Sequence, residues 1–304
     1  MLRFFAIAVV LGVGCSEPLA ELGDAERSDI YGGDDRHEVY EFPQGSPQRR
    51  AADATAALLV VPGGIGSARD LRVVRGEDIG KERSWCEGVR FYEQPSMGSC
   101  TGFLVGPNLL ATAGHCVDET TCADLAVVFD YSYDSSRDEG LDGEIVEFPK
   151  RNVYTCAEVL VHDYQPGGQC TSDYALLRLD RSVSGRTPLK VATEMPERGQ
   201  SLFSVGHPSG LPAKVATNAL VRRHRGATFG YELDLFAGNS GSPVLDEEGV
   251  VRGIHVCGGE GDYTKDPAPW NPDFELADGT CEVPLSCDEY CGRLGTAHDI
   301  AAIA

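Results

Sequence analysis

Basic residues are scarce in this chain of 304 residues, which has 26 lysines and arginines against 47 aspartates and glutamates. The resulting formal net charge of −21 at neutral pH repels phosphate groups and anionic lipid headgroups. The composition therefore argues against a general affinity for DNA, RNA or anionic membranes, and we expect no nucleic-acid partner.

Long apolar segments are also lacking, because the longest run, Phe4–Val13, is too short to span a bilayer. A positive charge before this run and small residues after it are typical of an export signal over residues 1–15. The letters GVGC resemble the lipobox of bacterial lipoproteins, with Cys15 as the lipidated residue, although Gly12 stands where that pattern prefers leucine. The alternative is an ordinary signal peptide cleaved near Ala20. Both interpretations predict an exported protein, extracellular or in the cell envelope; the first makes it an outer-membrane lipoprotein that touches the membrane only through Cys15.

The paired CxxC spacing of zinc sites is missing, although the chain holds 11 cysteines. Ten remain once Cys15 is removed, the even number that five disulfides use, and an exported protein meets an oxidising compartment. Residues 260–304 carry Cys281, Cys287 and Cys291 among prolines and glycines, and we interpret them as a disulfide-pinned insertion and C-terminal segment. Zinc binding is the competing interpretation of these cysteines.

Helical periodicity is almost absent, and we expect only one short helix, at the C-terminal end. Residues 16–50 are polar and acidic, which is typical of a linker or pro-segment followed by an N-terminal arm. Beyond residue 51, short runs rich in Val, Ile, Leu, Phe and Tyr recur between glycines, prolines, asparagines and aspartates. This pattern predicts an all-β protein of many short antiparallel strands, arranged as a sandwich or a barrel.

Three short motifs supply the groups that an alcohol nucleophile needs to hydrolyse an amide. His115 ends an apolar run in LLATAGHC, Asp173 begins one in SDYALLRL, and Ser240 lies between glycines in FAGNSGSP. We predict Ser240 as the nucleophile, His115 as its base and Asp173 as the residue that orients the base. The predicted oxyanion donors are the backbone N–H groups of Gly238 and Ser240. Each residue alone has a plainer interpretation, as a structural histidine, a turn aspartate or a turn serine.

The GxSxG elbow is absent, because Ser242 stands two residues after Ser240, and the order histidine, aspartate, serine differs from those of subtilisins and α/β-hydrolases. With three motifs in this order, the chain resembles the chymotrypsin-fold (trypsin-like) serine proteases, and among them the bacterial glutamyl endopeptidase-like (V8-type) enzymes. IYGGDDRHEVY is similar to the start of their mature chains, GSCTGFLVGPNLLATAGHC to their histidine block, and DLFAGNSGSPV to their serine block. The likeness runs from about Ile30 to Gly259.

The resemblance implies two packed antiparallel six-stranded β-barrels with the site between them. The first barrel is assigned to residues 51–180, with His115 and Asp173, and the second to residues 181–259, with Ser240. The implied reaction is peptide hydrolysis through an acyl-enzyme, on protein or peptide substrates, by a monomer that needs no cofactor and no metal. The competing class is a catalytically inactive protease-like binding module on the cell surface; the complete set of catalytic groups favours the enzyme.

The resemblance further implies a disulfide between Cys100 and Cys116, beside the histidine, and leaves the other pairings open. Asn239 departs from the animal digestive enzymes of this fold, which have an aspartate there to receive the amine released on activation. Glutamyl endopeptidases mature by cleavage just before a segment like IYGGDDR, and the same event here makes residues 16–29 a pro-segment.

Substrate preference is assigned to His255, Gly258 and Leu235, which the resemblance implies as substrate-binding residues. Glutamyl endopeptidases use a histidine at the position of His255 to meet an acidic side chain, which favours cleavage after Glu or Asp. Leu235 stands where those enzymes usually have threonine, so a broad or apolar preference is the alternative. Asp234, six residues before Ser240, raises a third alternative, since trypsin has its lysine- and arginine-selecting carboxylate at that spacing.

Two charge clusters have plain interpretations. The carboxylates of Asp130–Gly140 could bind calcium, but they match no EF-hand spacing and a solvated acidic loop is the better interpretation. The basic cluster Arg222–Arg225 is interpreted as an exposed strand end, with a substrate-facing patch as the alternative.

Overall fold

The structure, a computed structural model, describes residues 30–63, 71–74, 78–135, 141, 145–166, 170, 172–258, 263–266, 271, 273–287 and 294–303. The expected export signal with Cys15, the pro-segment and the later part of the acidic loop lie outside these residues. Within the described part, no helix is long and apolar enough to cross a membrane.

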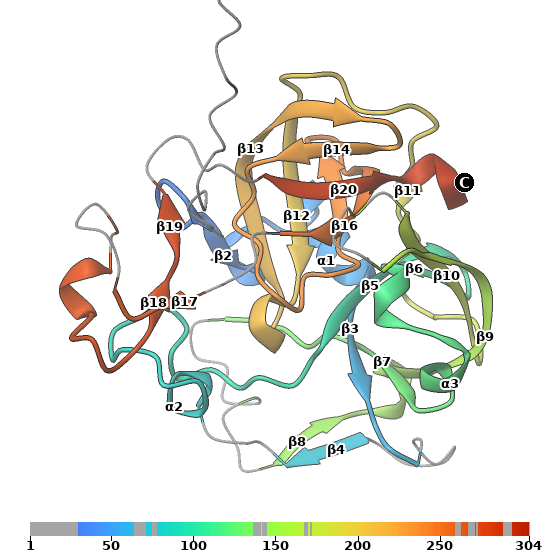
Figure 1. Ribbon diagram of the computed structural model, residues 1–304. Coiled ribbons are helices and arrows are strands. Elements are labelled where there is room, and N and C mark those ends of the chain that lie inside the picture. Colours follow the sequence, from blue (N-terminus) through green and yellow to red (C-terminus); the bar gives the residue numbers. More distant parts are fainter. Residues whose placement is uncertain are drawn as a thin grey trace, which may run out of the picture.

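Six antiparallel strands close the first barrel in the order β10-β6-β5-β3-β7-β9 (Figure 1). Their bounds are β3 Thr55–Val60, β5 Cys100–Gly106, β6 Leu109–Thr112, β7 Leu125–Phe129, β9 Val153–Tyr164 and β10 Asp173–Leu179. All five residues of β7, LAVVF, are buried, because one face fills the barrel and the other is covered from outside by β8, Ile145–Phe148, which pairs with β4, Leu71–Val74. Two covered faces explain why this strand is a continuous apolar run instead of an alternating one.

The second barrel follows the order β16-β15-β12-β13-β14-β20, and pairing of β20 with β16 closes it. Its strands are β12 Ser201–Gly206, β13 Lys214–Arg225, β14 Thr228–Tyr231, β15 Pro243–Asp246, β16 Val250–Cys257 and β20 Gly295–Asp299. Two further strands extend the sheet: β11, Lys190–Val191, runs parallel to β16, and β2, Arg36–Glu38, pairs with β13. The predicted all-β fold of two six-stranded barrels is confirmed.

The expected short C-terminal helix is the 3-10 helix Ile300–Ile303. The residues just before it, Gly295–Asp299, are strand, because they pair with β14 on one side and with β16 on the other. The other helices of the described part are short: α1 Pro47–Ala54, α2 Ile79–Glu82, α3 Glu119–Cys122 and four further 3-10 segments before Ser240, with one more, Phe274–Leu276, after it. The domain boundaries at residues 180 and 259 stay a prediction, and the closing strand comes from beyond the second one.

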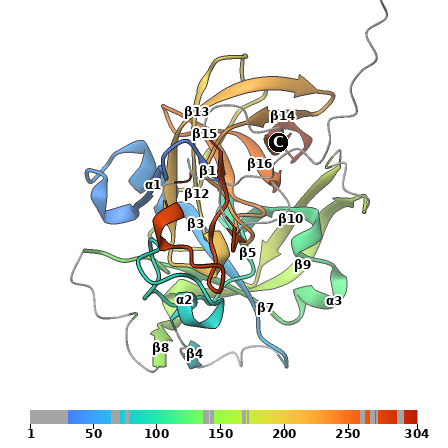
Figure 2. The same cartoon turned by 60° about the vertical axis from the view of Figure 1, so that its left-hand side comes forward.

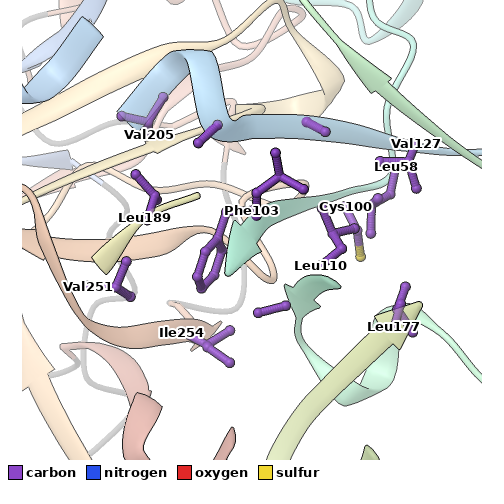
Figure 3. Packing of buried hydrophobic residues seen from close by; sticks show 14 of the residues in the cluster. Leu58, Cys100, Phe103, Leu110, Val127, Leu177, Leu189, Val205, Val251 and Ile254 are labelled. Carbon is purple, nitrogen blue, oxygen red and sulfur yellow. The ribbon is translucent and has the colours of Figure 1, made fainter. Parts of the chain in front are cut away.

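One apolar cluster joins the two barrels. Phe103 of β5 lies against Leu189, Val205, Val251 and Ile254, which belong to the second barrel and to the segment leading into it (Figure 3). Fully buried apolar side chains of this size each contribute about 1.5–3 kcal/mol to folding. The shared core therefore fixes the barrels relative to each other, which the site between them requires.

Four disulfides join described cysteines: Cys86–Cys281, Cys100–Cys116, Cys122–Cys156 and Cys170–Cys257. The pairing of Cys100 with Cys116 is the one that the resemblance implies. Cys281 is bonded to a cysteine 195 residues earlier, which removes its thiol from the zinc interpretation. Cys291 lies outside the described residues.

Beside the barrels, three segments that are distant in the sequence form what is called the accessory layer below. They are the arm strand β1, the region around α2 and the strands β17–β19; α2 and these last strands lie on the left of Figure 1, and Figure 2 shows the layer from another side. The arm strand β1, Ile30–Tyr31, pairs with β19, Ser286–Cys287, and β17, Tyr263–Thr264, pairs with β18, Val283–Pro284. A small core that includes Ile79, Trp85 and Val283 holds the layer together.

Candidate active site

His115 and Asp173 lie together because β6 and β10 are neighbours in the first barrel. His115 sits in the 3-10 helix Gly114–Cys116 directly after β6, and Asp173 is the first residue of β10. One carboxylate oxygen, Oδ1, accepts the backbone N–H of His115 at 2.9 Å, and Oδ2 lies 2.7 Å from Nδ1 of the ring. The carboxylate is only 6 % exposed, whereas the imidazole is 30 % exposed. A carboxylate acceptor holds the proton on Nδ1, so Nε2 is left to take a proton.

Ser240 lies beside His115 but belongs to the second barrel. It is part of the turn of residues 237–242 between β14 and β15, called the serine turn below. Its carbonyl oxygen accepts the backbone N–H of Thr101 at 2.8 Å and lies 3.5 Å from Sγ of Cys116, the residue after His115. Gly241 has φ +88°, and a Cβ there would stand 2.1 Å from the carbonyl oxygen of Thr101. Glycine is therefore required at that position for the serine turn to approach β5 so closely.

The same turn leaves two backbone donors for an oxyanion. The carbonyl oxygen of Ala237 accepts the N–H of Ser209 at 2.5 Å, and in a planar trans peptide the N–H of Gly238 points to the opposite side. The carbonyl of Gly238 is fixed by the hydroxyl of Thr101 at 2.8 Å. Among the described residues, no backbone hydrogen bond uses the N–H of Gly238 or of Ser240 as donor. Both predicted oxyanion donors therefore stay open in the turn.

His255 is tied to the serine turn on both sides. Its backbone carbonyl accepts the N–H of Gly241 at 2.8 Å, and its N–H donates to the carbonyl of Ser242 at 2.9 Å. Nδ1 lies 2.6 Å from the hydroxyl of Tyr231. Burial, followed by the nearby charge of His115, lowers the pKa of His255 to about 3, so the ring is neutral at physiological pH.

The other two predicted substrate-binding residues, Leu235 and Gly258, have different surroundings, and their role stays a prediction. Leu235 is buried in an apolar cluster of the second barrel, with Tyr231 and Val244 among its members. Gly258 follows β16 directly and is half-buried, next to the disulfide of Cys257. His255 differs from both in its two backbone hydrogen bonds to the serine turn.

Each of the two charge clusters has a described residue in an ion pair with a residue outside the cluster. Asp130 pairs with Arg186, with 2.6 Å between the charged atoms, and Arg222 of β13 pairs with Glu232, the residue directly after β14. Within the described chain, one group of atoms is compact enough for a metal ion, namely Cys100, His115 and Cys116. Their two sulfurs form a disulfide, which leaves no thiolate ligand there.

Comparison with known proteins identifies the family. The profile described as trypsin-like peptidase domain matches residues 100–254, just over half of the chain. The chain belongs to the trypsin-like peptidase family. This trypsin-like peptidase is 25 % identical over 159 residues to a glutamyl endopeptidase of Bacillus licheniformis, a match that covers 50 % of the chain and 46 % of the relative. The chain thus spans about half the length of the curated relative that it matches.

Solved structures similar to the trypsin-like peptidase are less alike in sequence. A Glu endopeptidase solved in complex with MPD is 16 % identical, with TM-score 0.47 and coverage of 90 % of this chain and 94 % of that one. Neuropsin, a serine protease of mouse brain, is 16 % identical, with TM-score 0.49 and coverage of 83 % and 92 %. A serine endoprotease from Yersinia pestis is 13 % identical, with TM-score 0.45 and coverage of 84 % and 62 %.

The sequence did not predict the roles of Thr101 and His207 in supporting the site of this trypsin-like peptidase, nor the partners of Asp234. Thr101 connects β5 to the serine turn, and buried His207 donates its backbone N–H to the hydroxyl of Thr101 at 3.1 Å. Asp234 accepts backbone N–H groups of Tyr31 and Asp35, which precede it by about 200 residues. Partners so distant along the chain leave no local pattern, and only the fold brings them together.

Proposed function

We propose that this protein is a serine endopeptidase that hydrolyses peptide bonds with Ser240, His115 and Asp173. The observation that carries the proposal is the His115–Asp173 pair at 2.7 Å beside a serine turn with two open N–H donors. Membership in the trypsin-like peptidase family supports the same chemistry. Four disulfides among the described cysteines support export to an oxidising compartment.

In the proposed reaction, Nε2 of His115 takes the hydroxyl proton of Ser240 as the oxygen attacks the scissile carbonyl. Asp173 holds the proton on Nδ1 and stabilises the imidazolium that forms. The negative oxygen of the tetrahedral intermediate accepts the N–H groups of Gly238 and Ser240. His115 then gives its proton to the leaving amine, and water, activated by the same ring, hydrolyses the acyl-enzyme.

We further propose cleavage after glutamate or aspartate, with His255 as the recognition residue. If the Tyr231 hydroxyl donates to Nδ1, the hydrogen of the neutral ring lies on Nε2, where it can donate to a substrate carboxylate. A basic preference is disfavoured because both oxygens of Asp234 already accept backbone N–H groups. The net charge of −21 opposes acidic substrates at low salt, so the preference should strengthen as salt screens this repulsion.

A fluorophosphonate probe tests the proposed nucleophile, because only an activated serine attacks its phosphorus centre. We expect labelling of the wild type and none of Ser240→Ala, with Ser242→Ala as the matched control that keeps its label. Equal labelling of the wild type and Ser240→Ala removes Ser240 from the nucleophile role. An unlabelled wild type favours the inactive binding module.

A peptide library varied at the residue before the cut tests the proposed preference. We expect cleavage after Glu and Asp in the wild type and loss of this preference in His255→Gln. Predominant cleavage after Arg, Lys or Leu refutes the acidic preference. An acidic preference that survives the substitution refutes the role of His255.

A further inference from the structure

The N-terminal arm, defined here as Ile30–Glu38, packs against the segment that leads to Ser240. Its strand β2 pairs with β13, with Arg36 opposite Ala216, and β1 pairs with β19 of the accessory layer. Between these two strands the arm crosses the second barrel beside Asp234. The arm is therefore held at both ends and meets the serine-bearing segment in its middle.

Asp234 binds the arm with both carboxylate oxygens. Oδ1 accepts the N–H of Tyr31 at 2.9 Å, and Oδ2 accepts the N–H of Asp35 at 2.6 Å. Asp234 is only 3 % exposed, so these two hydrogen bonds replace those that its carboxylate would make to water. A buried carboxylate without such donors would be strongly unfavourable, so the placement of Asp234 depends on the arm.

Arg36 makes a second contact between the arm and the same segment. Its guanidinium carbon lies 4.2 Å from the ring centre of Phe236, two residues after Asp234. Asp34 holds the guanidinium in place through Nε at 2.9 Å and Nη2 at 2.7 Å. A buried cation over an aromatic face contributes on the order of 1–2 kcal/mol, and the fork geometry makes the contact directional.

In the segment that receives these contacts, Leu233 and Leu235 pack into the apolar cluster of the second barrel, but the backbone is not part of a sheet. Residues 232–236 lie between β14 and the serine turn and belong to no strand, so no ladder of backbone hydrogen bonds sets their position. The residues that follow are Ala237, whose peptide directs the Gly238 donor, and then Ser240. A shift of the Asp234–Phe236 stretch would therefore change how the chain enters the serine turn.

We propose that Asp234 is a positioning residue that ties the N-terminal arm to the segment before Ser240, and that this tie fixes the wall contacting the substrate residue before the cut. The arm is thus part of the specificity site. This inference rests on the proposed endopeptidase function and deepens it, because it assigns to Asp234 a role in shaping the site without touching the substrate.

The charged groups that face Asp234 support a pH-sensitive tie. The pKa of Asp234 is raised to about 7, mainly by burial and also by Asp34 of the arm, although the N–H groups of Asp35 and Tyr31 and the charge of Arg36 lower it. The two N–H groups favour the ionised carboxylate, but they do not offset the water that it loses on burial. Because the pKa of the buried group lies above its usual 3.8, the tied state is favoured while the carboxyl is protonated, and the arm should be held less tightly as pH rises through 7.

The decisive substitution is Asp234→Asn, which keeps the shape but turns one acceptor oxygen into an N–H₂ that opposes an arm donor. The matched control is Asp246→Asn, because Asp246 is a buried aspartate of the same barrel that also accepts two backbone N–H groups, those of Glu248 and Val250, from its own turn. Both variants are made in the full chain. The measurements are KM and kcat on peptides with Glu, Leu or Arg before the cut, and the rate of fluorophosphonate labelling.

For Asp234→Asn we expect KM to rise at least tenfold and the selectivity among the three peptides to fall, with labelling within about threefold of the wild type. Asp246→Asn should keep the wild-type KM and selectivity. Unchanged KM and selectivity in Asp234→Asn, or equal losses in both variants, overturn the proposal. A pH profile adds a readout that a general loss of stability would not move, since the wild-type KM should rise as pH rises through 7 and that of Asp234→Asn should not.

A second pair of variants covers the case in which Asp234→Asn does not fold. Asp35→Pro deletes the N–H donated to Asp234, and Asp35→Ala keeps it, so only the proline should raise KM. Hydrogen exchange at the Tyr31 and Asp35 amides, followed in Ser240→Ala, measures the tie without any activity: these amides should exchange faster when Asp234→Asn is added. Equal exchange rates at these amides with and without Asp234→Asn refute the tie. A wild type that is inactive and not labelled by the fluorophosphonate refutes the proposed endopeptidase function, and the exchange rates then still decide whether the tie exists.

Discussion

Asp173 illustrates how one residue does two tasks, since its oxygens separately fix the backbone and the ring of His115. An asparagine there would present its oxygen to one donor and its N–H₂ to the other, which favours the wrong tautomer of the ring. We expect Asp173→Asn to lower kcat by about 10⁴-fold with the fold intact. Steady-state kinetics with purified enzyme measure this, and a loss below tenfold would contradict the role assigned to Asp173.

His207 gives a residue-scale prediction about pH. The ring is buried, donates from Nδ1 to the carbonyl of Leu211 at 3.0 Å, and stacks on Tyr131 of the first barrel. Burial lowers its pKa to about 4, with Lys214 adding to the effect. Because the folded pKa lies below the usual 6.5, the stability that the neutral ring contributes is complete above pH 6.5 and is lost as pH falls towards 4.

The expected loss between pH 7 and pH 4 from this group is about 3 kcal/mol. His207→Phe keeps an aromatic ring beside Tyr131 but cannot be protonated, so it should lose correspondingly less over this range, although it starts less stable at pH 7. Urea denaturation at both pH values, with Ser240→Ala as the common background to prevent self-digestion, gives the comparison. Parallel losses in the two proteins would show that His207 does not set the acid sensitivity.

At the scale of elements, the disulfide Cys86–Cys281 joins two segments of the accessory layer that are 195 residues apart in the sequence. Cys86 follows α2, and Cys281 precedes β18. Removing a bridge that closes so long a loop typically costs 2–5 kcal/mol. We expect the double variant Cys86→Ser, Cys281→Ser to unfold at lower denaturant, with the β17–β18 amides exchanging faster. Removing Cys122–Cys156, which lies in the first barrel, is the control and should leave exchange in β17–β18 unchanged.

The elements also show how far the sequence predicts the structure. The short apolar runs predicted the strands because each fills a barrel face, and the motifs around His115, Asp173 and Ser240 predicted the candidate triad because its chemistry needs those residue types. The expected C-terminal helix is limited to Ile300–Ile303, because Gly295–Asp299 forms a strand. This strand forms because it pairs with β14 and β16, which lie far from it in the sequence, so no local pattern predicts it. The partners of Asp234 are equally distant in the sequence and could not be predicted for the same reason.

For the whole molecule, the last strand decides whether the second barrel is closed. Without β20, the edges of β14 and β16 would expose unpaired backbone groups and buried residues such as Phe229. We expect deletion of residues 295–303 to give an unlabelled, aggregation-prone protein, while deletion of 300–303 alone keeps labelling. Solubility and fluorophosphonate labelling check this, and a labelled, soluble 295–303 deletion would contradict it.

The position of β20 in the chain sets the order in which this molecule can assemble. Ribosomes make proteins from the N-terminus, so Ser240 emerges 55 residues before Gly295, and all strands of the first barrel are complete long before either. Until Gly295–Asp299 has emerged, the second barrel has an open seam beside His255. A nascent chain therefore carries Ser240 in an incomplete barrel, and we expect the proposed triad to show no activity before Gly295–Asp299 has been synthesised and paired.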